Sequence, residues 1–205
     1  MAEIEKLIEE ILPIEWDMFH NVNGEARASC QDDWTGFKGL RTAQYIEWSD
    51  EALASYLEDL KACEAQGRNI AREKYIRMMR ISDPKGYEVL KKELPPVSKE
   101  KEDLVEEIWK IALPQTEKMR EEFPRVATGG RPLTIKEERG YPSVENYQKS
   151  ELLTYSEKTI RLLLEHIKKL EAEGIEFFRR VQENSVRCMG FSSMEDAEKQ
   201  LSGRG

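Results

Sequence analysis

Apolar side chains recur at every third or fourth position along most of the chain, which is the spacing of one face of an α-helix. The pattern predicts helices over residues 3–19, 33–48, 98–123 and 156–174, among others. No stretch of four to eight residues alternates between apolar and polar side chains as a half-buried strand would. We therefore expect an all-α protein with no sheet, folded as an antiparallel array of about seven to nine helices.

Proline and cap residues predict where individual helices bend, begin and end. Pro13 and Pro114 should kink the helices that contain them. A short helix is expected over residues 87–94, before a pair of prolines. Ser192 with Glu195 predicts a capping box at the start of the last helix.

Residues 124–142 show no periodicity and form the longest expected loop. Within it, Gly129-Gly130-Arg131 could fold over a pocket as a lid or form a plain surface loop. The length of 205 residues suits a single helical domain over residues 1–205. An alternative division sets residues 143–205 apart as a C-terminal helical subdomain.

The charge balance argues against nucleic acid as a partner. The chain has 32 Lys and Arg residues against 40 Asp and Glu residues, for a formal net charge of -8. The basic residues alternate with acids and form no stripe that would neutralise phosphates. No apolar stretch approaches the roughly 18 residues that a membrane span needs, and the acidic N-terminus lacks the apolar centre of a signal peptide. We expect a cytoplasmic protein with neither a nucleic-acid nor a membrane partner, and the oligomeric state stays open.

Cysteine and histidine are too few to predict a disulfide framework or a histidine-rich metal site. Cys30, Cys63 and Cys188 form no Cys-x-x-Cys pair, and an odd number cannot all pair within one chain, so reduced thiols are expected. His20 and His166 are the only histidines. No cofactor is predicted, and any divalent metal would be held mainly by carboxylates. The glycine motifs of nucleotide-binding sites do not occur in the sequence.

Several helices carry a polar side chain where their own periodicity requires an apolar one. These residues are Glu15, Arg41, Gln44, Glu151, Asn184 and Ser185. Burying an unpaired carboxylate or guanidinium costs several kcal/mol, so such side chains persist where they meet one another or a ligand. One interpretation is a structural network in which Arg41 forms a bidentate pair with Glu15 or Glu151. The other, which the size of the set favours, is a polar pocket between helices.

Residues 21–34 form a polar segment between two helical patterns and contain few large apolar side chains. Such a segment is either a solvated loop or a site. Cys30 precedes a helix N-terminus, where the helix dipole would lower the pKa of its thiol and favour a nucleophilic thiolate. The sequence offers it no clear histidine partner, so a packed, inert thiol is the alternative.

The candidate chemistry combines anion binding with proton transfer. Arginines are the natural clamp for an anionic group, and a carboxylate whose pKa is raised by desolvation could act as a base. The candidate catalytic residues are Asp32, Asp33, Glu15, Cys30, Glu73 and Tyr155. The candidate substrate-binding residues are Asn23, Arg27, Ser29, Gln31, Arg41, Gln44, Arg68, Asn69, Lys74, Arg131, Glu151 and Asn184. For Arg68, Asn69 and Glu73, a salt-bridged helix surface is the simpler interpretation.

The order of motifs along the chain resembles a bacterial family of domains of unknown function. The longest of these motifs is the run Arg-Ala-Ser-Cys-Gln-Asp-Asp-Trp that ends at Trp34. The shorter ones are Gly67-Arg68-Asn69, Glu73-Lys74-Tyr75, Met78-Met79, Gly130-Arg131-Pro132, Glu151-Leu152, Thr154-Tyr155-Ser156 and Glu183-Asn184. The resemblance spans nearly the whole chain and implies a single helical domain. It implies no particular reaction.

Three functions fit these observations. The first is an enzyme of lyase or hydrolase type that acts on a small anionic metabolite, such as an amino or organic acid, held by arginines in the pocket. The second is a metabolite-binding or regulatory module, which a pocket without an acid or base in reach of the ligand would favour. The third is a carboxylate-bound metal enzyme. Its donors would be Glu15, Asp32, Asp33, Glu73 and Glu151.

Overall fold

In a computed structural model of the protein, residues 2–22, 28–127 and 130–203 are described. Within these ranges the regular structure is all helical, as predicted, and no strand occurs. The α-helices are α1 (Ala2–His20), α2 (Trp34–Tyr45), α3 (Asp50–Ala65), α4 (Ile70–Ser82), α5 (Pro84–Leu90), α6 (Lys99–Glu122), α7 (Val144–Leu152), α8 (Glu157–Ala172), α9 (Phe177–Cys188) and α10 (Met194–Ser202). Short 3₁₀ helices are η1 (Ser29–Asp32), η2 (Lys91–Glu93) and η3 (Ile135–Glu137). None of the helices described is long and apolar enough to cross a membrane.

Polar caps fix most of the helix starts. Ser49, Ser98 and Ser156 each accept a hydrogen bond from the backbone N–H three residues further on, which satisfies a donor that the helix itself leaves free. Helices α1 and α6 each run on without interruption past the proline inside them, Pro13 and Pro114. Local sequence thus sets most of the helix boundaries.

The count of ten α-helices in the described ranges exceeds the seven to nine expected, because short helices begin at caps of their own. Helix α5 starts at Pro84, earlier than predicted, since the Asp83 side chain accepts the Gly86 N–H and proline fits the first helical turn. The predicted capping box at the last helix was wrong by one residue. There, Ser193 is the N-cap and accepts from the backbone N–H of Asp196.

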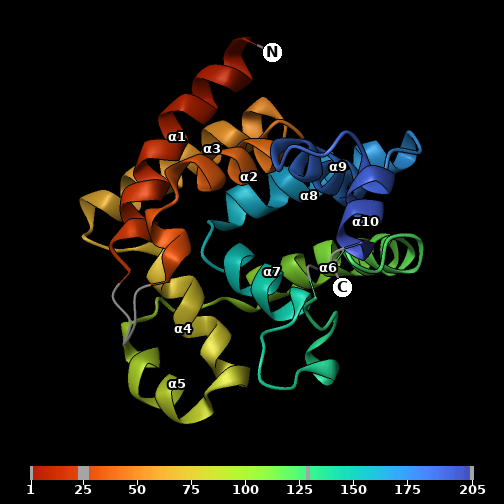
Figure 1. The fold of residues 1–205 in the computed structure, drawn as a ribbon. Coiled ribbons are helices and arrows are strands. Elements are labelled where there is room, and N and C mark those ends of the chain that lie inside the picture. The colour runs from red at the N-terminus through yellow and green to blue at the C-terminus, as the bar shows by residue number, and fades with distance from the viewer. Residues whose placement is uncertain (1, 23–27, 128–129, 204–205) are drawn as a thin grey trace.

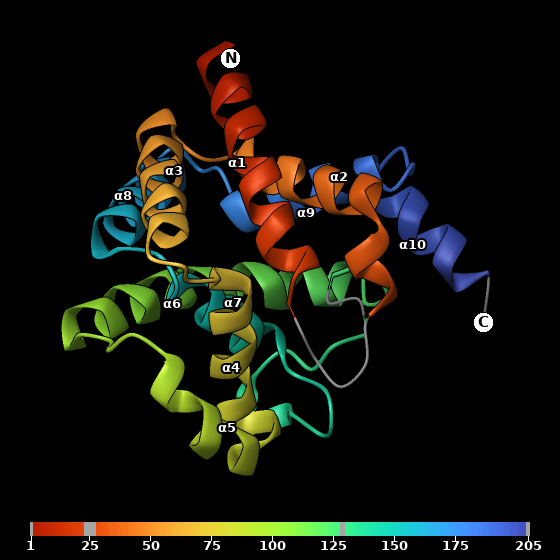
Figure 2. The same ribbon diagram turned by 90° about the vertical axis from the view of Figure 1, so that its left-hand side faces the viewer.

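Most of the helices form two groups that face each other in both views, and α10 lies to one side of them (Figures 1 and 2). Helices α1, α2, α3, α8 and α9 make up one group, and α4, α5, α6 and α7 lie beneath it. Segments far apart in sequence are neighbours: α2 packs on α9, α4 on α7 and α3 on α8. The main core contains fully buried side chains from several helices, among them Ile11, Leu53, Ile108 and Ile160. This arrangement brings the polar positions of α1, α2, α4 and α7 toward one place.

Candidate functional site

A cavity of about 600 Å³ lies where the two groups of helices meet. Side chains from α1, α2, α3, α4, α6, α7, α8 and α9 line it, and most of its wall is aromatic or aliphatic. Its charged lining residues are Glu15, Asp33, Arg41, Lys74, Arg131 and Glu151. A largely apolar hollow with a few converging polar groups is the usual form of a small-molecule site.

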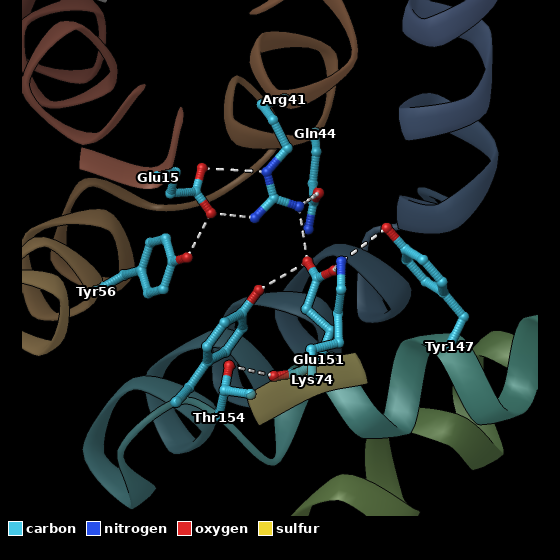
Figure 3. A network of polar contacts seen from close by, with 9 residues as sticks. Glu15, Arg41, Gln44, Tyr56, Lys74, Tyr147, Glu151 and Thr154 are labelled. Atoms are coloured by element: carbon cyan, nitrogen blue, oxygen red, sulfur yellow. Dashed lines mark hydrogen bonds and ion pairs between the residues drawn. The ribbon is translucent and has the colours of Figure 1, made fainter. Parts of the chain in front are cut away.

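Arg41 is the centre of the polar wall (Figure 3). Its Nε donates to Oε2 of Glu15 at 3.1 Å, and its Nη2 donates to Oε1 of the same carboxylate, which makes the pair bidentate. Its Nη1 donates to Glu151 Oε1 at 2.7 Å and to Gln44 Oε1 at 3.0 Å. The guanidinium from α2 thus bridges carboxylates from α1 and α7. This contact explains why three helices carry a charge on an otherwise apolar face.

Glu151 is shared between this arginine and a lysine. Its Oε2 accepts a hydrogen bond from Lys74 Nζ at 3.2 Å, and its Oε1 also accepts one from the Tyr155 hydroxyl at 3.0 Å. Lys74 donates in addition to the Tyr147 hydroxyl at 2.9 Å and lies 4.3 Å from the centre of that ring. The Lys74 and Glu151 side chains are each only 11% exposed. Charge and aromatic faces therefore compensate the burial of both groups.

The network fixes the protonation states of its members. Burial disfavours the charged form of Glu151, yet Arg41 and Lys74 together hold the pKa of its carboxyl well below the usual range. Burial also disfavours charge on Lys74, but the neighbouring carboxylate raises the pKa of its ammonium above the usual range. Burial, reinforced by Glu151, raises the pKa of Tyr155 well above that of a free phenol. At neutral pH these three groups stay ionised, protonated and neutral, respectively.

The rim of the cavity carries three further predicted residues, Cys30, Asp33 and Arg131. Asp33 caps α2, accepting the Gly36 N–H at 2.8 Å. Cys30, in η1, is an exposed free thiol. Arg131 donates to a backbone carbonyl of the same loop and lies over the Tyr147 ring, with the guanidinium carbon 5.6 Å from its centre. The polar segment before α2 and the long loop before α7 thus both reach the cavity.

Comparison with known families now adds one finding. Over residues 5–199, the chain matches the model of a family described as protein of unknown function (DUF4125). The chain belongs to this family. No curated protein matches it, and no solved structure does. Family membership assigns no reaction, so any function has to be argued from the cavity.

Four predicted residues near η1 and α4 lie outside the lining of the cavity. Gln31 ties η1 to the end of α1, with its Nε2 donating to Phe19 and Val22 carbonyls at 3.1 and 2.9 Å. Asn69 caps α4 and donates to the Met18 carbonyl at 2.7 Å. Ser29 and Asp32 are exposed. Gln31 thus holds the segment that carries Cys30 and Asp33, and Asn69 holds the start of α4 against α1.

The remaining predicted residues are engaged elsewhere. Arg68 forms a bidentate pair with Glu73, at 2.8 and 2.9 Å, away from the lining of the cavity. Asn184 donates to the buried Glu47 carboxylate at 2.7 Å on the α2–α9 side. Asn23 and Arg27 lie outside the described residues. The predicted set therefore divides into a group at the cavity and a group with local partners.

The carboxylates named for a metal site are divided in the same way. Glu15 and Glu151 both bind Arg41, whereas Glu73 binds Arg68. Across residues 2–22, 28–127 and 130–203, no three His, Cys, Asp or Glu side chains are grouped so that they could hold a metal ion. The donor set expected for the metal alternative is therefore not assembled there.

Sequence reasoning missed three aromatic residues that take part in the polar wall. Tyr56 of α3 donates to Glu15 Oε1 at 2.5 Å, and Tyr147 receives the Lys74 ammonium. Trp48 lines the cavity, and its indole N–H has no hydrogen-bond partner among the described residues. All three occupy apolar positions of the helical pattern, where a tyrosine or tryptophan is interpreted as a core residue. The available signal was the polar atom that each ring carries, because a buried hydroxyl or indole N–H needs a partner.

Proposed function

We propose that the chain binds a small metabolite that carries a carboxylate in this cavity. The observation that supports the proposal is a surplus of hydrogen-bond donors on the wall. Within the described residues, the four hydrogen bonds of Arg41 use four of its five N–H groups, and Lys74 uses two of three. Since Arg41 only donates, Gln44 must turn its oxygen toward it, and the amide N–H₂ of Gln44 has no partner in those ranges.

A carboxylate is the group that best satisfies such donors. A buried donor without a partner costs about 1–3 kcal/mol, and the Trp48 indole N–H is in this state. A carboxylate is acceptor-only and takes several hydrogen bonds at once, most strongly from cationic donors. Arg131 adds a further cation at the rim. The aromatic and aliphatic walls suit an apolar body attached to the acid.

The protonation states favour binding over acid–base chemistry. A general acid or base works best when its pKa lies near the operating pH. Glu151, Lys74 and Tyr155 all have pKa values displaced away from neutrality, so none of them is poised to exchange a proton there. A metabolite-binding or regulatory module therefore fits the cavity better than the lyase or hydrolase expected first.

An enzyme remains the second candidate because Cys30 and Asp33 lie on the same cavity wall, next to the N-terminus of α2. A thiol nucleophile or a carboxylate base at the rim would act on the exposed end of a bound molecule. To test this, a bound carboxylate is incubated with wild type and with Cys30→Ser and followed by mass spectrometry. Conversion by wild type alone would favour the enzyme, and an unchanged ligand would favour the binding module.

We propose that the protein binds its ligand in the bacterial cytoplasm. Cys30, Cys63 and Cys188 are all free in the structure, and two of them are exposed. Exposed thiols persist most readily in a reducing compartment. Small carboxylates would reach the cavity from the metabolite pool of the same compartment.

The proposal is tested with a pair of variants that spare the buried network. Leu40 and Ile46 are similarly exposed, at 43% and 44%, but only Leu40 lines the cavity. A panel of small organic and amino acids is screened by thermal shift against wild type, Leu40→Trp and Ile46→Trp. We expect at least one carboxylate to raise the unfolding midpoint of wild type and Ile46→Trp but not of Leu40→Trp, because the new indole fills the mouth. A panel without any such compound would contradict the proposal.

A further inference from the structure

The formal charges around the cavity cancel. Three lining residues are acidic and three are basic: Glu15, Asp33 and Glu151 against Arg41, Lys74 and Arg131. A ligand with a net negative charge would therefore add an uncompensated charge to a partly buried site, where charge is costly. A ligand that is itself neutral overall keeps the balance.

The wall also keeps spare acceptors beside its spare donors. Glu15 Oε2 accepts only from Arg41, and Glu151 Oε2 accepts only from Lys74, among the residues described. Each carboxylate oxygen has two lone pairs, so one acceptor position is open on each. Both lie next to a cation that has an open N–H. The wall thus offers positive and negative groups side by side, from α1, α2, α4 and α7 (Figure 3).

Apart from this wall and from Asp33 and Arg131 at the rim, no charged residue lines the cavity among the residues described. Phe37 of α2, Ile70 of α4 and Phe178 of α9 line it together with other apolar side chains. A bulky apolar group placed there would leave water and bury its surface against these residues, at a gain of roughly 25 cal/mol per Å². The expected ligand therefore has a zwitterionic end and an apolar end.

We infer that the ligand is an α-amino acid with a bulky apolar side chain. Its carboxylate accepts from the open N–H groups of Arg41, Lys74 and Trp48, and its ammonium donates to Glu15 or Glu151. The side chain occupies the apolar wall. This inference rests on the proposed function, because it names the ligand class of the same cavity.

Two matched series of probes separate the contribution of the ligand's carboxylate from that of its ammonium group. The aromatic series is L-phenylalanine, 3-phenylpropanoate and 2-phenylethylamine, the aliphatic series is L-leucine, 4-methylpentanoate and 3-methylbutylamine, and glycine serves as the zwitterion without a side chain. Calorimetric titration of the full chain at pH 7 should show, in at least one series, the amino acid binding at least tenfold more tightly than its acid, its amine or glycine. Leu40→Trp should lose this binding, and Ile46→Trp should keep it.

The outcomes distinguish the two proposals. An acid that binds as tightly as its amino acid overturns the zwitterion and leaves the proposed carboxylate site standing. An amine that binds most tightly overturns both. Binding by no probe overturns the inference, whereas the proposed function falls only if the whole carboxylate panel fails as well.

Glu151→Gln supplies a second, sign-specific readout. Neutralising one acid gives the cavity a net positive charge and removes one partner for the ammonium. We expect the preference for the amino acid over its matched acid to fall at least tenfold, with the acid binding more tightly than it does to wild type. An equal loss of both ligands would assign Glu151 a structural role and overturn the inference.

Discussion

Two buried glutamates, Glu73 and Glu151, are neutralised by arginine in contrasting ways. Glu73 binds Arg68, five residues away in sequence, through both oxygens, and the pair lies outside the lining of the cavity. Glu151 binds Arg41, 110 residues away, and shares its oxygens with Lys74 and a phenol at the cavity wall. The local pair joins two side chains of one segment and borders no cavity. The long-range cluster joins four helices, and its unused donors and acceptors lie on residues that line the cavity, which distinguishes a candidate site from a structural ion pair.

The largest loss of stability is expected when the central arginine, Arg41, is replaced. Arg41→Met leaves Glu15 and Glu151 without their shared cation in a site where all three side chains are at most 15% exposed. We expect a loss of about 3–5 kcal/mol in the free energy of unfolding at pH 7, measured by urea denaturation. Arg68→Met should cost only about 1–2 kcal/mol, because the Arg68 side chain is a third exposed and water replaces part of the interaction.

Arg161→Met is the control for this pair, because its partner Glu100 is also exposed and the change should stay within about 0.5 kcal/mol. Equal losses from Arg41 and Arg68 would remove the distinction between the two clusters.

The next largest effect on the free energy of unfolding is expected from acid titration of Glu151 in the same long-range cluster. The pKa of Glu151 is lower in the folded protein than its ordinary value of 4.5, so the unfolded chain binds the proton more readily. Its stabilisation is therefore present above about pH 4.5 and is lost as the pH falls further. At up to about 1.4 kcal/mol per pH unit, wild type should lose at most about 2 kcal/mol between pH 4.5 and pH 3 that Glu151→Gln does not lose.

Urea denaturation from pH 7 to pH 3 measures this difference. Glu107→Gln is the matched control, because Lys168 also lowers the pKa of Glu107, but that carboxylate faces solvent. Parallel acid profiles for wild type and Glu151→Gln would show that the buried carboxylate is not held ionised by its partners.

Sequence periodicity predicted the helical class and much of the polar wall for one physical reason. A polar residue in an apolar stripe must find a partner, and Glu15, Arg41, Gln44 and Glu151 do meet at one cavity. The same signal could not separate these from Asn184, which pairs with Glu47 instead. Pairing across the fold depends on which helices pack together, and that is not encoded in the periodicity of any one helix.

The start of a short helix and the aromatic site residues could not be predicted from the sequence, for related reasons. Helix α5 depends on a single cap, Asp83, so its position follows one hydrogen bond rather than a long stripe. Tyr56 and Trp48 satisfy an apolar stripe and a polar site at the same time, and the pattern shows only the first role. The periodicity of apolar residues therefore does not reveal a binding residue when that residue is a tyrosine or tryptophan.

Removing a single tyrosine hydroxyl tests how far the polar network at the cavity depends on its phenol donors. Tyr56 is fully buried and donates to Glu15, so Tyr56→Phe removes one bond to a charged acceptor. We expect a loss of about 1–2 kcal/mol in the free energy of unfolding. Tyr75 also lines the cavity, but its hydroxyl bonds to no residue in the described ranges, so Tyr75→Phe should stay within about 0.5 kcal/mol. Similar losses from both variants would mean that the network does not depend on its phenolic donors.

The smallest effect on stability is expected at Gln44. For this residue, a structural role and a ligand-binding role predict different results. Gln44→Leu removes an acceptor of Arg41 and a free amide, but the guanidinium keeps Glu15 and Glu151, and the side chain is only half-buried. The free energy of unfolding should change by no more than about 0.5 kcal/mol. The affinity for the bound carboxylate should fall about tenfold, which corresponds to one lost hydrogen bond.

Asn184→Leu gives the opposite pattern, because its amide serves the buried Glu47 and does not line the cavity. It should cost about 1 kcal/mol of stability and leave ligand affinity unchanged. If Gln44→Leu instead destabilised the fold and spared binding, Gln44 would belong with Asn184 among the side chains that only stabilise the fold. The carboxylate would then be held without the Gln44 amide.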